Sequence, residues 1–167
     1  MELLEIYNNE GKPTGRVIQR GDKSVTFLDN EHIAVGVIFI ENSKGEFLFQ
    51  KTSKEKGGKF SSTGGHITYG ETPITSIVRE VKEELGIDID ENEIVELGYL
   101  LYDMPIRFIF YIKKDIDLKD IVLQEEEVEY VEYMSVDKIK KLIADELTYT
   151  SHAKMFEKVL EYKAMKK

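Results

Sequence analysis

The chain has 167 residues, of which 41% are apolar and 33% are charged, and its formal net charge is −9. This composition is typical of one globular domain, and it excludes a disordered chain. The absence of Cys excludes disulfides and thiolate metal ligands, while the excess of acid makes duplex nucleic acid an unfavourable partner. No apolar run approaches the ~20 residues that span a bilayer, and the N-terminus lacks a signal-peptide pattern. We therefore expect a cytoplasmic protein that binds no membrane.

In the first part of the chain, β-branched and alternating segments predict strands. Two short strands should surround an Asn-Asn-Glu-Gly turn and form a hairpin extension within residues 1–25. A third segment is apolar on both faces, as a central strand would be, and the fourth follows it after a turn. A Gly-rich loop then leads into the middle of the chain. These predicted elements are strands at 2–7, 14–20, 33–40 and 46–52, and a loop at 54–62.

The second part of the chain mixes strands with helices. Two strand patterns flank the turn Asp103-Met104-Pro105, and a further short strand precedes two amphipathic helices. No linker or internal repeat divides the chain, so we expect one domain over residues 1–167. Strands combined with three helices indicate an α/β layered fold with a mixed sheet. The predicted strands are 94–102, 106–113 and 129–134, and the predicted helices are 73–85, 135–145 and 151–163.

The helix predicted at 73–85 has two chemically different faces. Thr72 is a good N-cap, Pro73 suits the first helical position, and Gly86 is expected just past the C-terminus. At 100° per residue, five aliphatic side chains form one stripe, and three glutamates lie on the far side. The stripe consists of Ile74, Ile77, Val78, Val81 and Leu85, and the glutamates are Glu80, Glu83 and Glu84.

Three carboxylates on one face repel each other, but a hard divalent cation such as Mg²⁺ prefers such oxygen ligands. The same cation neutralises a diphosphate and acidifies a bound water, whose proton a nearby carboxylate can accept. Arg79, flanking this face, could pair with Glu71 at the helix entrance, and Gly65 would let a backbone carbonyl approach the metal. The alternative is a Glu- and Lys-rich helix face that only keeps the surface soluble.

The spacing of these residues from Gly65 to Ile87 resembles, position for position, the 23-residue signature of the Nudix hydrolases: GHITYGETPITSIVREVKEELGI. The resemblance implies an α/β/α sandwich and hydrolysis of a nucleoside diphosphate derivative with Mg²⁺ or Mn²⁺. It implies metal binding by Glu80 and Glu84, a ligand or general-base role for Glu83, a carbonyl ligand at Gly65, and a structural pair of Arg79 with Glu71. Family members often add a carboxylate from a late loop, for which we favour Glu127, although a solvated acidic run is the alternative.

Residues before and inside the signature are candidates for holding the substrate. Four lysines precede it, of which we assign Lys51 and Lys59 to substrate binding, and His66 beside Gly65 is assigned to metal or phosphate contact. A solvated lysine loop and a histidine without a role are the alternatives. The diphosphate could carry a nucleobase, a sugar, a prenyl or another group. The exposed N-terminal strand leaves pairing into a homodimer open.

The sequence flanking the signature resembles isopentenyl-diphosphate isomerase, another member of the superfamily. The catalytic Cys of that enzyme would fall at Gly64, and one of its metal-binding histidines at Val25, leaving His32 and His66. The complete set of signature acids is that of the hydrolases, so we expect hydrolase chemistry on an isomerase-like framework. A module that only binds nucleotides is a further alternative, but such a chain would be free to lose a signature acid, and none is lost.

Overall fold

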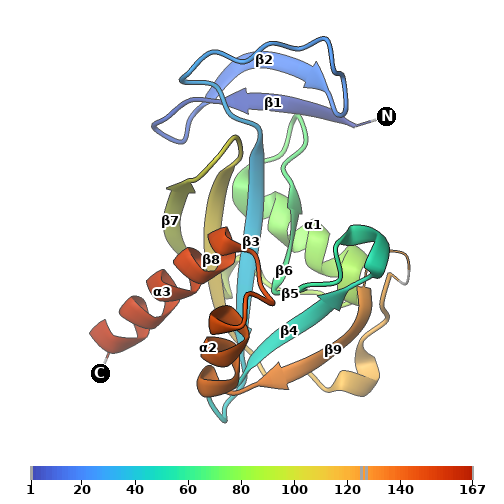
Figure 1. Ribbon diagram of the computed structural model, residues 1–167, viewed down its shortest axis with the longest axis vertical. Helices are drawn as coiled ribbons and strands as arrows, with labels where there is room; N and C mark the ends of the chain where they lie inside the picture. Colours follow the sequence, from blue (N-terminus) through green and yellow to red (C-terminus); the bar gives the residue numbers. More distant parts are fainter. Residues whose placement is uncertain (1, 125, 127, 167) are drawn as a thin grey trace.

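The computed structural model describes residues 2–124, 126 and 128–166. It has a seven-stranded mixed sheet with helices on both faces and a separate two-stranded hairpin at one end (Figure 1). The strands are β1 Leu3–Tyr7, β2 Pro13–Gln19, β3 Ala34–Glu41, β4 Phe47–Thr52, β5 Phe60–Ser61, β6 Thr63–His66, β7 Val95–Leu101, β8 Ile106–Lys113 and β9 Val128–Met134. The helices are α1 Pro73–Leu85, α2 Val136–Ala144 and α3 Thr150–Met165, with short 3-10 turns η1 Lys54–Lys56, η2 Glu91–Glu93 and η3 Leu118–Asp120.

Strand β3 lies at the centre of the sheet, which forks beside it. On one side β3 pairs in parallel with β8 along its whole length, from Ala34 opposite Ile106 to Glu41 opposite Lys113. On the other side its first half pairs with β6, whereas β4 meets it only at Glu41, opposite Phe47. Strand β4 pairs instead with β5 and β9. The sheet therefore opens between β4 and the first half of β3.

The two faces of the sheet carry separate apolar cores. Ile38 and Ile40 of β3 pack with the buried stripe of α1, whereas Val37 and Phe39 face α2 and α3. Side chains alternate between the faces of a strand, and both faces of β3 are covered. The apolar run predicted at 33–40 is thus the central strand that its composition indicated.

Helix α1 has the bounds predicted from its capping residues. The Thr72 hydroxyl accepts a hydrogen bond from the Thr75 amide at 3.2 Å, and the Thr75 hydroxyl accepts one from the Thr72 amide at 2.9 Å. These two bonds satisfy amides that a helix start leaves without partners. At the other end Gly86 adopts a left-handed φ of 72°, which ends the helix. Both ends of α1 are fixed by local contacts.

The N-terminal hairpin β1–β2 is joined to the sheet domain through His32. The backbones of Tyr7 and His32 exchange two hydrogen bonds of 2.9 Å. The His32 ring lies 2.8 Å from the Met104 carbonyl through Nδ1 and 2.6 Å from the Asn9 side-chain oxygen through Nε2. His32 therefore links the β1–β2 turn to the β7–β8 turn. In the part of the chain that the structure describes, no helix is both long and apolar enough to cross a membrane.

Two strands lie where the sequence indicated only a loop and the start of a motif. Strand β5 has two residues and β6 has four, including two glycines, so neither shows the alternation of apolar and polar residues that identifies a strand. Strand β5 pairs with β4, the strand just before it, whereas β6 pairs with the distant β3. Strand β6 carries Gly64, Gly65 and His66 and places them beside α1.

Candidate active site

Arg79 lies at the centre of the predicted acidic site. Its Nε and Nη2 donate to the two carboxylate oxygens of Glu71 at 2.6 and 2.9 Å. Its Nη1 donates to Glu80 at 2.8 Å and to Glu83 at 3.1 Å, and Nη2 also donates to the His66 carbonyl at 3.1 Å. One guanidinium thus ties the loop before α1, strand β6 and two carboxylates of the acidic face together. A bidentate guanidinium fixes both distance and orientation.

The same contacts set the protonation of the structural pair. Burial alone would raise the pKa of Glu71, but hydrogen bonds from Arg79 and Thr68 outweigh it and hold that pKa below its ordinary value. The hydrogen bond to Glu71 leads the effects that raise the pKa of Arg79. Both groups are therefore charged at neutral pH, and the pair is an ion pair.

Gly65 packs directly against the carboxyl group of Glu80. A Cβ built at position 65 would overlap all three carboxyl atoms of Glu80, so only glycine fits here. The Glu80 side chain is 13% exposed. Burial raises the pKa of Glu80 to about 7, although the Arg79 guanidinium opposes this shift. The structure thus brings the backbone of Gly65 and an acidic side chain of α1 into contact.

The other two glutamates of the face lie at different depths. Glu84 is buried, with 3% of its surface exposed, whereas the Glu83 side chain is 52% exposed. Among the described residues no three His, Asp or Glu side chains converge as a ready-made metal cage. Glu80 and Glu83 each form an ion pair with Arg79, which is one reason why these carboxylates do not converge on a single point. The donor chemistry, carboxylates beside a glycine backbone, nevertheless fits Mg²⁺, which takes few protein ligands and completes its shell with waters and phosphates.

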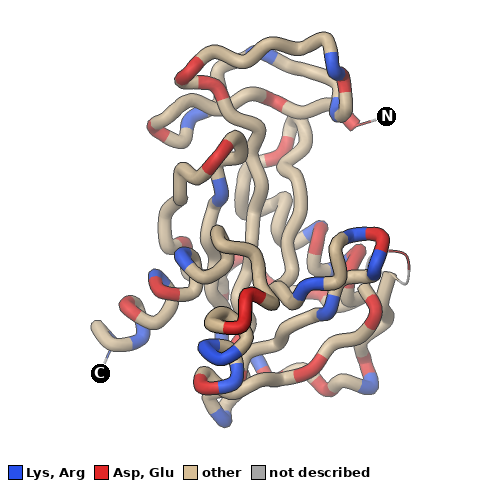
Figure 2. The backbone as a smooth tube through the Cα atoms, in the orientation of Figure 1, with Lys and Arg blue, Asp and Glu red and all other residues tan. Residues whose placement is uncertain are grey.

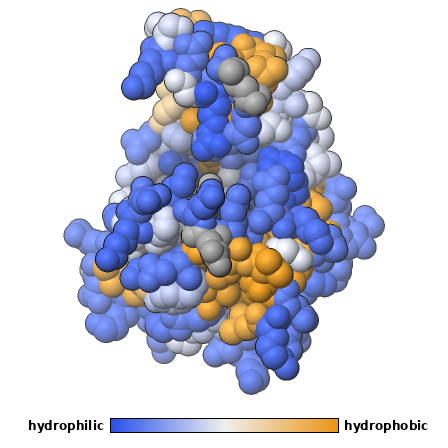
Figure 3. All heavy atoms as spheres, turned by 90° about the vertical axis from the view of Figure 1, so that its right-hand side faces the viewer, coloured by the Kyte–Doolittle hydropathy of each residue, from blue (hydrophilic) through white to orange (hydrophobic). Residues whose placement is uncertain are grey.

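The segment before β9 comes back to the C-terminal end of α1. The Val122 amide donates to the Leu85 carbonyl at 2.8 Å, and the Gln124 amide donates to the Glu84 carbonyl at 3.3 Å. Val122 is 70% exposed. Figure 3 shows apolar side chains gathered below the centre of the face that it draws. Glu127, predicted as an additional ligand, lies outside the described residues. The segment that precedes it reaches the helix that carries Glu84.

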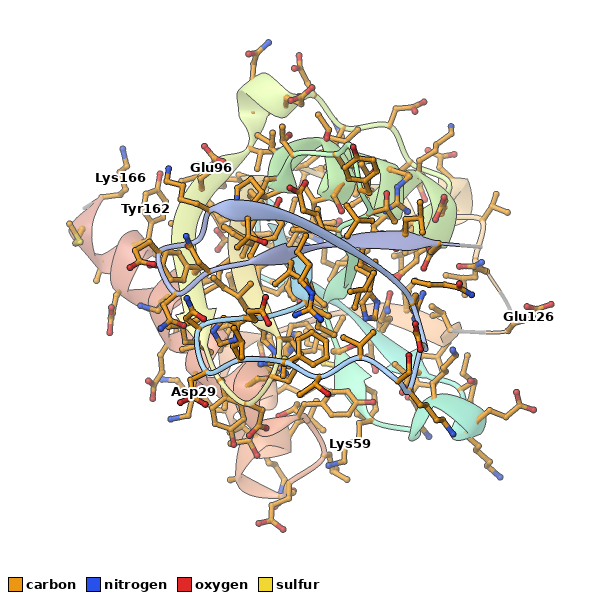
Figure 4. The ribbon with its side chains drawn as sticks, turned by 90° about the horizontal axis from the view of Figure 1, so that it is seen from above. Asp29, Lys59, Glu96, Glu126, Tyr162 and Lys166 are labelled. Atoms are coloured by element: carbon orange, nitrogen blue, oxygen red, sulfur yellow. The ribbon has the colours of Figure 1, made fainter. Side chains whose placement is uncertain are left out.

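A pocket of about 640 Å³ lies where the sheet forks, and Gly64, Gly65 and His66 form part of its wall. Lys59 also lines it, on a different side of the molecule from Tyr162 and Lys166 (Figure 4). The lysines around η1 form the basic segment seen at the right of Figure 2.

Lys51, the other lysine assigned to substrate binding, is not part of the pocket wall. Its ammonium lies 5.9 Å from the centroid of the Phe60 ring. The structure therefore brings Lys59 and His66 to the pocket but not Lys51.

Position 64 leaves no room for a side chain. A Cβ there would overlap the Gly36 carbonyl oxygen and come within 3.2 Å of Val37, because β6 pairs closely with β3 at this point. The isomerase-type Cys would have to occupy this position. This chain therefore lacks the Cys, and its backbone at position 64 also leaves no space for any other side chain.

The sequence did not indicate the side of the pocket opposite Gly64, Gly65 and His66. Residues of β8, the β7–β8 turn and the start of α3 form this side. Arg107 shares the inward face of β8 with the buried Ile109 and Tyr111. A charged residue among apolar ones at period-2 spacing was the signal that could have identified it. His152, near the start of α3, also lines the pocket, and its Nε2 accepts hydrogen bonds from the Ser62 amide and hydroxyl, both at 2.8 Å.

His152 gives a pH-dependent stability. Burial, assisted by the charge of Arg107, lowers the pKa of His152 to about 3, so the folded protein holds it neutral. The unfolded chain binds a proton more readily between pH 6.5 and 3, so stability is complete above pH 6.5 and falls as the pH decreases. We expect this group to lower the unfolding free energy by about 1.4 kcal/mol per pH unit in that window. Urea titrations from pH 7 to 4 should show a steeper loss for the wild type than for His152→Gln, and equal slopes would contradict the assignment.

Comparisons with known proteins support the fold. The model of the NUDIX domain matches residues 30–159. An uncharacterized Nudix hydrolase of Listeria innocua is 34% identical over 147 residues, covering 85% of both chains. The isopentenyl-diphosphate Delta-isomerase of Corynebacterium diphtheriae is 29% identical over 112 residues, covering 64% of this chain and 58% of that one. The crystal structure of a Deinococcus radiodurans protein superimposes with a TM-score of 0.72 at 21% identity, covering 88% of this chain and 91% of the other.

Proposed function

The chain belongs to the Nudix hydrolases, which act on phosphoanhydride bonds, and from this premise we propose that it cleaves a nucleoside diphosphate derivative or a related diphosphate with Mg²⁺ or Mn²⁺. The observation that carries the proposal is the contact of Gly65 with Glu80, held by Arg79 at the edge of a 640 Å³ pocket. A carboxylate face beside a pocket of this size can bind a diphosphate through a cation and accommodate the attached group.

The residues have separate roles in this proposal. Glu80, Glu84 and the Gly65 carbonyl would hold the cation, and Glu127 is the additional ligand that we propose. When bound, the cation neutralises the diphosphate and acidifies a water. Glu83 is the most exposed of the three glutamates on the face, and it acts as a further ligand or as the general base that accepts the proton of the attacking water. Arg79 and Glu71 orient the carboxylates, and Lys59 and His66 lie where they can contact the substrate.

Isomerisation of an allylic diphosphate is the second candidate, since an isomerase is among the relatives. The lack of space for a side chain at Gly64 and the absence of Cys disfavour isomerase activity. A binding module without catalysis is disfavoured because all the signature acids are present and three of them contact Arg79.

The experiment is a substrate panel with purified protein. Nucleoside triphosphates, dinucleoside polyphosphates, nucleotide sugars and prenyl diphosphates are incubated with Mg²⁺, Mn²⁺ or EDTA, and the released phosphate and monophosphate are measured. We expect cation-dependent cleavage of at least one class and a loss of about 100-fold or more in Glu83→Gln.

The matched control is Glu157→Gln, which removes an exposed carboxylate from α3 and should retain wild-type turnover. Unchanged turnover in Glu83→Gln would contradict the role of Glu83. Conversion of isopentenyl diphosphate without phosphate release would favour the isomerase instead.

A further inference from the structure

The pocket is cationic in a protein that is strongly acidic. Among the described residues, its wall contains Lys56, Lys59 and Arg107 but only one carboxylate, Asp103, whereas the whole chain has a net charge of −9. A locally positive cavity in an acidic molecule concentrates anions at that point. Lys56 and Lys59 lie in η1 and just after it, whereas Arg107 lies in β8, so the fold brings two distant parts of the chain together here.

Arg107 occupies the part of this wall opposite the acidic site. Val35 of β3 lies between His66 and Arg107 in the sheet, with one neighbour on each side. With strands spaced about 4.8 Å apart, the backbones of His66 and Arg107 are about 10 Å apart. A sugar-sized unit can span this separation, so a substrate whose diphosphate lies at Gly65 can reach Arg107 with its next functional group.

The guanidinium of Arg107 is only partly used by the protein. Its Nη1 donates to the carbonyls of Tyr102 and Pro105 in the β7–β8 turn. No carboxylate of the described residues lies within ion-pair distance of it, and Asp103 acts only through its field. A half-buried arginine without a carboxylate partner is favourable when an anion completes its hydrogen bonds, and a phosphate can do so in a bidentate manner.

The aromatic rings of the pocket already have cationic partners. The Arg107 guanidinium lies 5.7 Å from the Tyr102 ring centroid, and the Lys154 ammonium lies at 5.7 Å from the same ring. The Lys59 ammonium lies 5.4 Å from the Tyr149 ring, whose hydroxyl donates to the Lys56 carbonyl at 2.9 Å. These contacts favour cations at the ring faces over a stacked nucleobase. They also position Lys59 and Arg107 on the wall.

From these contacts we propose that Arg107 is a specificity-determining residue that binds a phosphate group carried by the substrate in addition to its diphosphate. The inference rests on the proposed diphosphate hydrolysis and narrows its substrate class. A neutral prenyl group or an uncharged base in the pocket would leave the Arg107 charge desolvated and without a counter-ion.

The test compares substrates that differ by one phosphate. NADPH and NADH differ by a 2′-phosphate, and coenzyme A and dephospho-coenzyme A by a 3′-phosphate. We expect kcat/KM to be about ten- to hundred-fold higher for the phosphorylated member of at least one pair. Arg107→Gln should remove this preference by lowering kcat/KM for that member alone, and Arg107→Lys should keep part of it. The control is Lys140→Gln, an exposed lysine of α2 outside the pocket wall, which should keep the preference.

A binding measurement separates this inference from the hydrolysis itself. Calorimetric titration with adenosine 2′,5′-bisphosphate, adenosine 3′,5′-bisphosphate and AMP needs no turnover, so it tests Arg107 even if no substrate of the panel is cleaved. We expect one bisphosphate to bind about ten-fold more tightly than AMP, and Arg107→Gln to equalise the two. Equal affinities in the wild type overturn the inference, as does a preference that survives in folded Arg107→Gln.

Discussion

Replacing Glu80 by Gln should lower kcat/KM by about a thousand-fold while leaving the fold intact. The substitution keeps the shape and an acceptor oxygen for Arg79 Nη1, so the contact at 2.8 Å can persist. It removes the negative charge that lies against Gly65, where we propose that the cation binds. Lewis-acid stabilisation contributes several kcal/mol to such a transition state, and each 1.4 kcal/mol is a factor of ten in rate.

Stability should change in the opposite direction from activity. Burial raises the pKa of Glu80 to about 7, so the fold disfavours the charged carboxylate. With the ordinary value near 4.5, this group makes the unfolding free energy fall as the pH rises from about 4.5 to 7. In EDTA at pH 8, Glu80→Gln should therefore have a Tm equal to or above that of the wild type. Retained turnover, or a Tm well below that of the wild type, would contradict the position that we assign to Glu80.

Local signals predicted the elements whose ends are fixed by neighbouring residues. Helix α1 begins after Thr72 and ends before Gly86 as expected, because both caps are contacts within a few residues. Five of the seven strands of the main sheet, β3, β4, β7, β8 and β9, were predicted to within a residue at each end, since their apolar patterns are continuous, whereas β5 and β6 were not predicted. The parallel pairing of β3 with β8 and the pairing of β3 with β6 have no local signal, because they join segments far apart in the chain. The fork of the sheet, and with it the pocket, could therefore not be predicted.

The candidate site also has a part that local sequence predicts and a part that it does not. Glu71 and Arg79 are eight residues apart, in α1 and the loop before it, and the structure joins them in a bidentate ion pair. The pocket wall depends on tertiary contacts. Lys59 lies in it and Lys51 does not, although both are near in sequence, because strand β4 ends between them and the chain turns through η1. Arg107 was missed because the role of a single charged residue in an apolar strand can be inferred only when the residues on the opposite side of the pocket are known.

Arg79→Ala should reduce both stability and activity, because one side chain joins four groups. Without it, the hydrogen bonds that described residues still donate to Glu71 come from Thr68, at 2.9 Å from the amide and 2.6 Å from the hydroxyl. Glu80 and Glu83 also lose their cationic partner. Breaking a buried pair costs about 3 to 5 kcal/mol, and the 27% exposure of Arg79 reduces this, so we expect a loss of about 2 kcal/mol in urea unfolding.

The activity of Arg79→Ala should fall about ten- to hundred-fold, less than that of Glu80→Gln, because Arg79 positions the carboxylates and would not itself hold the cation. The Mg²⁺ concentration for half-maximal rate should rise, and Arg79→Lys should recover part of the stability because it keeps the charge but not the bidentate geometry. Glu71→Gln and the double variant complete a cycle. If Arg79 acts through Glu71, the two losses in stability are not additive and the coupling exceeds about 1 kcal/mol. Additive losses would show instead that Arg79 acts mainly through Glu80 and Glu83, and the loop before α1 would then be held by other contacts.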